Sequence, residues 1–230
     1  ATVNIESTTA NLDIYDTITS TAGNVSLIAA TNIVTNATGD TITAADGATL
    51  TAGSAVTLAD DLQGKFVTIT AGGNVGVELV TATTADVTVT AGGSFTNSDV
   101  VSATLGDVTI TADGGITTSA NVTATSGDLS LTSAAAIDTQ DDVLTAGSDI
   151  NVNGATVTLN TVTAGAAVSV TSANAATLKG AVQGATVNIE STTANLDIYD
   201  TITSTAGNVS LIAATNIVTN ATGDTITAAD

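Results

Sequence analysis

Apolar and polar residues alternate in short runs along the whole chain, and these runs recur at nearly constant spacing. Alternation with a period of two is typical of β-strands rather than helices. Neighbouring runs lie 18 to 23 residues apart. One assignment has a competitor, because Val56-Thr57-Leu58 matches the pattern as well as Ala48-Thr49-Leu50 does. The apolar–polar–apolar pattern begins at Val3, Val25, Ala48, Val67, Val87, Val108, Leu129, Ile150, Val168, Val187 and Val209.

A single unit of about 20 residues contains three such runs. In one of them, Val108–Ala112 is predicted as a first strand, Gly115–Ser119 as a second and Asn121–Ala124 as a third. Between the strands lie Gly, Asn, Asp and Ser, which favour turns. Three short strands make one triangular coil, and a coil buries its apolar face only by stacking on its neighbours, ~4.8 Å apart. The sequence therefore predicts an all-β fold, a parallel β-helix solenoid with three strands per coil.

The alternative fold is a string of immunoglobulin-like sandwiches of ~100 residues each. Such a sandwich gives no reason for a 20-residue repeat and usually has a bulky aromatic core. The chain has only four aromatic residues, Tyr15, Phe66, Phe95 and Tyr199. Small aliphatic side chains, which dominate here, suit a narrow coil better.

A second, longer repeat overlies the short one. Residues 185–230 are identical to residues 1–46, so the long period is 184 residues and contains nine of the shorter units. We expect residues 1–184 to form one full repeat and residues 185–230 to begin the next, with no linker in one continuous solenoid. The identity of the two segments suggests that the chain is part of a longer tandem array. Its expected partners are therefore further copies of itself.

Composition narrows the function classes. The formal charge of −20 argues against nucleic acid and anionic membranes as partners, because both select for Lys and Arg. His and Cys are absent, so the commonest general base and the most reactive nucleophile are both missing. We therefore expect no enzyme activity. Apolar runs stay far below the ~20 residues of a membrane span.

Two segments resemble the repeats of filamentous-haemagglutinin-type adhesins, which are large bacterial exoproteins. They are residues 106–116, Gly-Asp-Val-Thr-Ile-Thr-Ala-Asp-Gly-Gly-Ile, and residues 22–30, Ala-Gly-Asn-Val-Ser-Leu-Ile-Ala-Ala. The resemblance implies a right-handed parallel β-helix, an extracellular or cell-surface location in a bacterium or archaeon, and a stalk or adhesive role. Identical 184-residue copies depart from the irregular repeats of that family. This departure favours a non-catalytic structural fibre over a receptor-binding adhesin, which stays the alternative.

Four aspartates form the sharpest candidate for a binding site. Asp86, Asp107, Asp128 and Asp149 lie 21 residues apart, each directly before the first strand of its unit. Stacked coils would bring their carboxylates within ~5 Å of one another, where they repel unless they splay into water or a cation lies between them. Ca²⁺ is the candidate cofactor; the alternative is that Asp serves only as a turn residue that bonds to its own backbone. The pairs Asp60-Asp61 and Asp141-Asp142 are expected in solvated loops.

Threonines form a second pattern on the outward positions of the first strands. An outward array of Thr-x-Thr resembles that of ice-binding proteins, which is a lesser alternative function; the other interpretation is that Thr suits any exposed sheet face. Three units interrupt the array, because their outward pairs are Asn4 and Glu6, Ser26 and Ile28, and Asn151 and Asn153. The predicted ladder consists of Thr49, Thr51, Thr68, Thr70, Thr88, Thr90, Thr109, Thr111, Thr132 and Thr171, with Ser130 and Ser169 at two equivalent positions.

Overall fold

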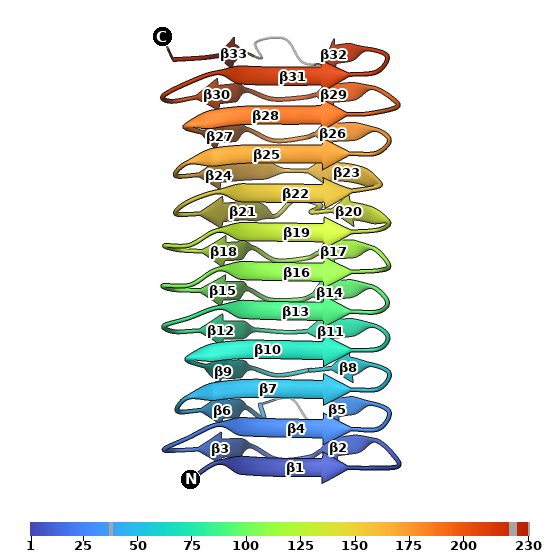
Figure 1. Ribbon diagram of the computed structural model, residues 1–230, viewed down its shortest axis with the longest axis vertical. Helices are drawn as coiled ribbons and strands as arrows, with labels where there is room; N and C mark the ends of the chain where they lie inside the picture. Colours follow the sequence, from blue (N-terminus) through green and yellow to red (C-terminus); the bar gives the residue numbers. More distant parts are fainter. Residues whose placement is uncertain (37–38, 221–224, 230) are drawn as a thin grey trace.

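The computed structural model describes residues 1–36, 39–220 and 225–229. These residues form a parallel β-solenoid with three strands in each coil, as the sequence predicts (Figure 1). Eleven strands stack in each of three sheets, which we call A, B and C. Within the described residues there are only strands and turns, and no helix that could cross a membrane.

Each sheet takes every third strand of the chain, and every pairing is parallel. Sheet A contains β1 (Val3–Ser7), β4 (Val25–Ala29), β7 (Gly47–Ala52), β10 (Phe66–Ala71), β13 (Val87–Ala91), β16 (Val108–Ala112), β19 (Leu129–Ser133), β22 (Ile150–Gly154), β25 (Ala167–Ser172), β28 (Thr186–Ser191) and β31 (Val209–Ala213). Sheet B contains β2 (Leu12–Ile14), β5 (Ile33–Thr35), β8 (Val56–Thr57), β11 (Val75–Val77), β14 (Phe95–Asn97), β17 (Ile116–Thr118), β20 (Ala136–Asp138), β23 (Thr156–Leu159), β26 (Ala176–Leu178), β29 (Leu196–Ile198) and β32 (Ile217–Thr219). Sheet C contains β3 (Ile18–Ser20), β6 (Ile42–Ala44), β9 (Leu62–Gly64), β12 (Val80–Ala82), β15 (Val101–Ala103), β18 (Val122–Ala124), β21 (Val143–Ala146), β24 (Thr161–Ala164), β27 (Val182–Gly184), β30 (Ile202–Ser204) and β33 (Ile226–Thr227).

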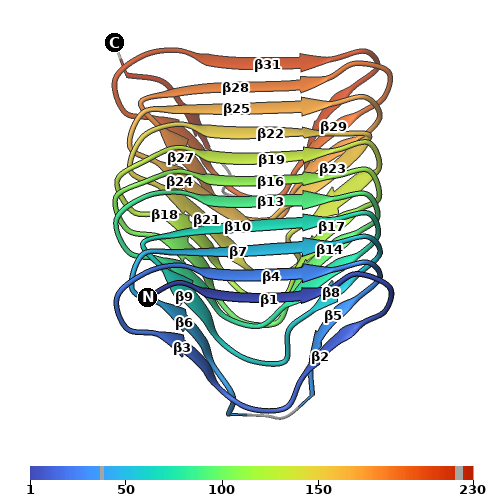
Figure 2. The same cartoon turned by 60° about the horizontal axis from the view of Figure 1, so that its bottom comes forward.

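The coil is right-handed. In Figure 1 the chain runs from left to right along the near sheet A, returns behind through sheets B and C, and rises with each pass. This is the hand found almost always in parallel crossover connections. Viewed more nearly along the axis, sheet A forms the broad side and sheets B and C converge on a narrow corner (Figure 2).

The register of sheet A is the one that the short repeat predicts. Val87 pairs with both Val67 and Val108, so equivalent apolar residues stack in columns from coil to coil. Ala48 pairs with Val25, whereas Val56 lies in sheet B, which decides the ambiguous assignment. The predicted strands at 115–119 and 121–124 are observed as β17 and β18, each a residue or two shorter.

The core is one continuous stack of aliphatic side chains inside the triangle. Along β16 the burial alternates, with Val108 and Ile110 fully buried and Thr109 and Thr111 half-exposed. Phe95 is the largest fully buried side chain and the only aromatic one among the buried core residues of the described chain. At ~25 cal/mol per Å² of buried apolar surface, this stack is the main source of stability.

Candidate functional site

The four predicted aspartates lie in one column along the corner where sheet C leads into sheet A. Each directly precedes its sheet A strand, and the strands β13, β16, β19 and β22 are successive neighbours in register. The first two aspartates differ in exposure from the last two, since Asp86 and Asp107 are exposed and Asp128 and Asp149 are half-buried. The column therefore forms as the sequence predicts.

Each carboxylate in this column accepts a hydrogen bond from the backbone of the next coil. Oδ1 of Asp86 accepts from the N–H of Asp107 at 2.9 Å, and Oδ1 of Asp107 accepts from the N–H of Asp128 at 2.8 Å. The series continues from Asp128 to the N–H of Asp149 at 3.0 Å and from Asp149 to the N–H of Ala167 at 2.8 Å. These bonds run between coils, so the expectation that each Asp bonds to its own turn is wrong. We call this series the aspartate ladder.

Two of the ladder aspartates, Asp107 and Asp128, directly follow a glycine. A Cβ atom on Gly106 would lie 2.4 Å from Oδ1 of Asp86, and one on Gly127 would lie 2.4 Å from Oδ1 of Asp107. Both distances are below any normal contact between carbon and oxygen. Backbone atoms of the preceding coil would be as close, so glycine at these two positions leaves room for both the backbone and the carboxylate of that coil.

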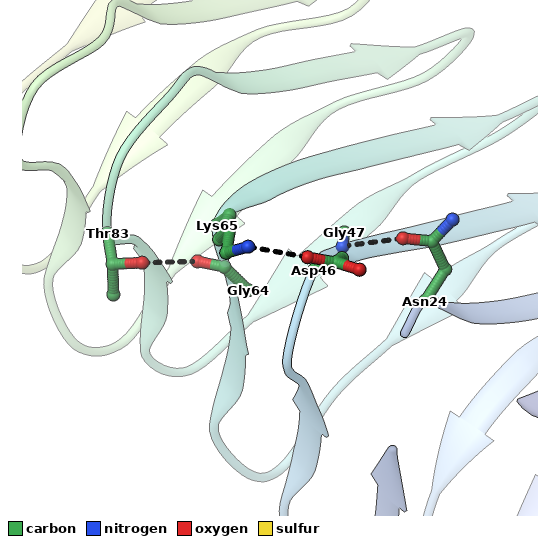
Figure 3. A network of polar contacts seen from close by, with 6 residues as sticks. All are labelled: Asn24, Asp46, Gly47, Gly64, Lys65 and Thr83. Carbon is green, nitrogen blue, oxygen red and sulfur yellow. Dashed lines mark hydrogen bonds and ion pairs between the residues drawn. The ribbon is translucent and has the colours of Figure 1, made fainter. Parts of the chain in front are cut away.

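The same corner changes its chemistry in the coils that precede the ladder (Figure 3). Oδ1 of Asn24 accepts from the N–H of Gly47 at 2.8 Å, so an amide replaces the carboxylate. One coil further, Nζ of Lys65 lies 2.6 Å from Oδ1 of Asp46. Both side chains of this pair are about half exposed, so it adds at most about 1 kcal/mol of stability.

The geometry of the ladder bears on the predicted calcium site. One oxygen of each carboxylate already has a backbone donor, and the backbone donors offset part of the repulsion between neighbouring charges. Among the described residues, no three acidic side chains are gathered as a ready-made set of metal ligands. Calcium binding by this column stays a prediction.

Substitutions at Asp107 separate the hydrogen bond from the charge. We expect Asp107→Ala to lower the free energy of unfolding by about 1 kcal/mol, because the N–H of Asp128 loses its acceptor. Asp107→Asn keeps an acceptor oxygen and removes one charge from the column, so we expect wild-type stability or slightly more at low ionic strength. Chemical denaturation at low and high salt measures both. Equal losses in the two variants would contradict the hydrogen-bond role.

The predicted threonine ladder is present on the outer face of sheet A. Thr68 pairs with Thr49 and Thr88, and Thr70 pairs with Thr51 and Thr90, so two parallel columns run up the sheet. The columns continue through Thr109 and Thr111 to Ser130 and Thr132. Asn151 and Asn153 then interrupt them before Ser169 and Thr171, as the sequence predicts.

A third feature lies at the narrow corner where sheet B leads into sheet C, and the sequence reasoning missed it. A cavity of about 230 Å³ is lined by Gly39, Asp40, Thr41, Ala59, Asp60, Asp61 and Glu78. We call it the acidic pocket, since four of its residues carry carboxylates. Asp60 is only 6% exposed, so the expectation that the Asp60-Asp61 pair lies in a solvated loop is wrong for Asp60. The other pair fits the expectation better, with Asp141 exposed and Asp142 half-buried.

Comparison of the chain with protein-family models, with curated proteins and with solved structures finds no match in any of the three. The likeness to filamentous-haemagglutinin-type adhesins thus rests on the repeat pattern. The structure supports its coarser part, a parallel β-solenoid.

Proposed function

We propose that this chain is a section of an extracellular structural fibre or stalk that spans distance and has no catalytic role. The main support is the junction between the two copies of the 184-residue repeat. There β25 pairs with β28 over six residues, from Ala167 with Thr186 to Ser172 with Ser191. The first coil of one copy thus pairs in register with the last coil of the copy before it.

All three sheets cross this junction without a break. β26 pairs with β29, and β27 pairs with β30. Buried side chains continue through it, since Val168 and Val170 stack against Val187 and Ile189, all at most 1% exposed. Tandem copies joined in this way extend one rod, because the junction between copies has the same pairing as the interior of a copy.

Such a rod suits a mechanical role. Its backbone hydrogen bonds point along the axis from coil to coil, and stretching the rod must break many of them together. The charge of −20 per 230 residues keeps neighbouring rods soluble and apart. An adhesin of the same fold would need these features too, and would add a surface that recognises one receptor.

The length of tandem chains tests this proposal. Chains of one, two and three copies of residues 1–184 should form single unbranched rods that lengthen by about 43 Å per copy, which is nine coils at ~4.8 Å each. Electron microscopy and small-angle X-ray scattering measure the increment. Copies that fold as separate beads, with an increment that varies from particle to particle, would contradict a continuous fibre. High-affinity binding of one receptor by a single copy would favour the adhesin alternative.

A further inference from the structure

The acidic pocket lies where three successive coils turn through the narrow corner. The connection before β6 is the longest of the three in sequence, with six positions between β5 and β6, four between β8 and β9, and two between β11 and β12. Asp40 comes from the first turn, Asp60 and Asp61 from the second and Glu78 from the third. Acidic residues from three consecutive coils therefore line one cavity.

Two carboxylate oxygens in this pocket are buried without a partner. Oδ1 of Asp60 accepts from the N–H of Gly39 at 2.6 Å, but its Oδ2 is buried and has no hydrogen bond to any described residue. Oδ2 of Asp40 is likewise buried and has no hydrogen bond to any described residue. Within the described part of the chain only one other buried side-chain atom lacks a partner, Oδ1 of Asn97. The two unsatisfied anionic oxygens are thus concentrated in one cavity.

Buried charges of this kind require compensation. An unpaired carboxylate oxygen removed from water costs several kcal/mol, so native proteins satisfy it with a donor, a water or an ion. The chain has two lysines, and neither lines the pocket. Lys65 pairs with Asp46 at a different corner, and Lys179 lies in the turn after β26. The compensating group must therefore come from solution, as water or as a cation.

We propose that the acidic pocket is a calcium site, with the buried oxygens of Asp40 and Asp60 as its fixed ligands. Ca²⁺ takes six to eight oxygen ligands in flexible geometry and accepts carboxylates and water together. Asp61 is exposed and Glu78 is half-buried, so both can rotate toward an ion held by the first two. This rotation is needed, because no three acidic side chains of the described residues are gathered as ligands beforehand.

The pocket differs from the aspartate ladder because it contains buried carboxylate oxygens without hydrogen-bond donors. In the ladder, Oδ1 of each carboxylate has a backbone donor and the corner is open to water. In the pocket, two carboxylate oxygens of lining residues are buried and lack donors among the described residues. Calcium in the pocket would tie three successive coils together at this corner. If the chain is a tandem fibre, as proposed above, this clamp recurs once every 184 residues.

Calorimetric titration with CaCl₂ and thermal unfolding test the site. We expect one ion to bind per chain of residues 1–230 and saturating CaCl₂ to raise Tm by about 5–10 °C. KCl at the same ionic strength, which screens the overall charge, should give a smaller rise. Asp60→Asn keeps the acceptor for Gly39 and removes the charge, so it should abolish both the binding heat and the calcium-specific rise in Tm. Asp113→Asn, which removes one exposed charge outside both the pocket and the ladder, is the matched control and should keep both.

Three results would overturn the proposal. The first is a wild-type chain that shows no calcium effect beyond that of KCl. The second is an Asp60→Asn chain that binds calcium as tightly as wild type, and the third is loss of binding in Asp113→Asn. If Asp60→Asn does not fold in EDTA, judged by circular dichroism, Glu78→Gln takes its place and should weaken binding at least tenfold. Rod length measured in EDTA reports on the fibre separately, so failure of the site and failure of the fibre are distinguishable.

Discussion

Replacing Ile110 by aspartate is expected to unfold the middle of the solenoid, whereas the same replacement one residue earlier is expected to be tolerated. Ile110 is fully buried between its equivalents Val89 and Leu131. A carboxylate there has no donor within reach and loses its water, so the free energy of unfolding should fall by more than about 4 kcal/mol. Thr109 faces solvent between Thr88 and Ser130, and Thr109→Asp should cost less than about 1 kcal/mol.

Denaturant unfolding of both variants measures this contrast, and hydrogen exchange locates it. Each coil contacts mainly its two neighbours, so amides of β13, β16 and β19 should lose protection first in Ile110→Asp. Ile110→Val is the control for lost volume and should cost about 0.5–1.5 kcal/mol. Similar losses for Ile110→Asp and Thr109→Asp would contradict the alternating burial on which the fold rests.

The fold could be predicted from the sequence because local and global signals agree. Val108 and Ile110 are apolar and Thr109 is polar, and this period of two recurs at a spacing that only stacked coils satisfy. All eleven predicted starts of the short repeat lie in sheet A strands, in register with one another. Even the ambiguous unit at Ala48 follows the majority pattern, because its neighbours fix the register from both sides.

The candidate sites could be predicted only in part. The alignment of Asp86 with Asp107 could be predicted, because residues spaced by one coil length stack in a column. The partner of each carboxylate was not, because it is the N–H of the next coil and depends on the geometry between coils. Burial of Asp60 was missed because it depends on the turn of the preceding coil. One signal could have shown it, since the 23 residues from Val25 to Ala48 exceed the usual spacing and imply an enlarged turn.

The separation between core and corners explains how one fold can carry different chemistry along its length. Inward positions repeat with little change, so the stack continues through every coil. Corner positions vary freely between Asn24, Lys65 and Asp86, because each needs only to satisfy one or two groups of its neighbours. Length and surface chemistry are therefore specified by different residues of the same repeat.

Removing one whole coil should leave a shorter solenoid of nearly unchanged stability, whereas removing half a coil should destroy the fold around the cut. Deletion of residues 108–128 brings Leu129 to the place of Val108, and the two are register partners in the intact protein. The same holds for Ile137 with Ile116 and Leu144 with Val122. The aspartate ladder also survives, because Asp149 then donates its N–H to Asp107 in place of Asp128.

Deletion of residues 108–118 is the matched comparison, since it starts at the same residue and removes about half as much chain. It eliminates a sheet A and a sheet B strand but keeps β18, so Ser119 would follow Asp107 in the place of Val108 and Asn121 would lie in the place of the buried Ile110. We expect the whole-coil variant to melt within about 3 °C of wild type and to lose ~4.8 Å of length. The half-coil variant should expose apolar surface, bind a hydrophobic dye and aggregate. A whole-coil variant as damaged as the half-coil one would show that the coils are not interchangeable, and would remove the basis for a role in which length is what matters.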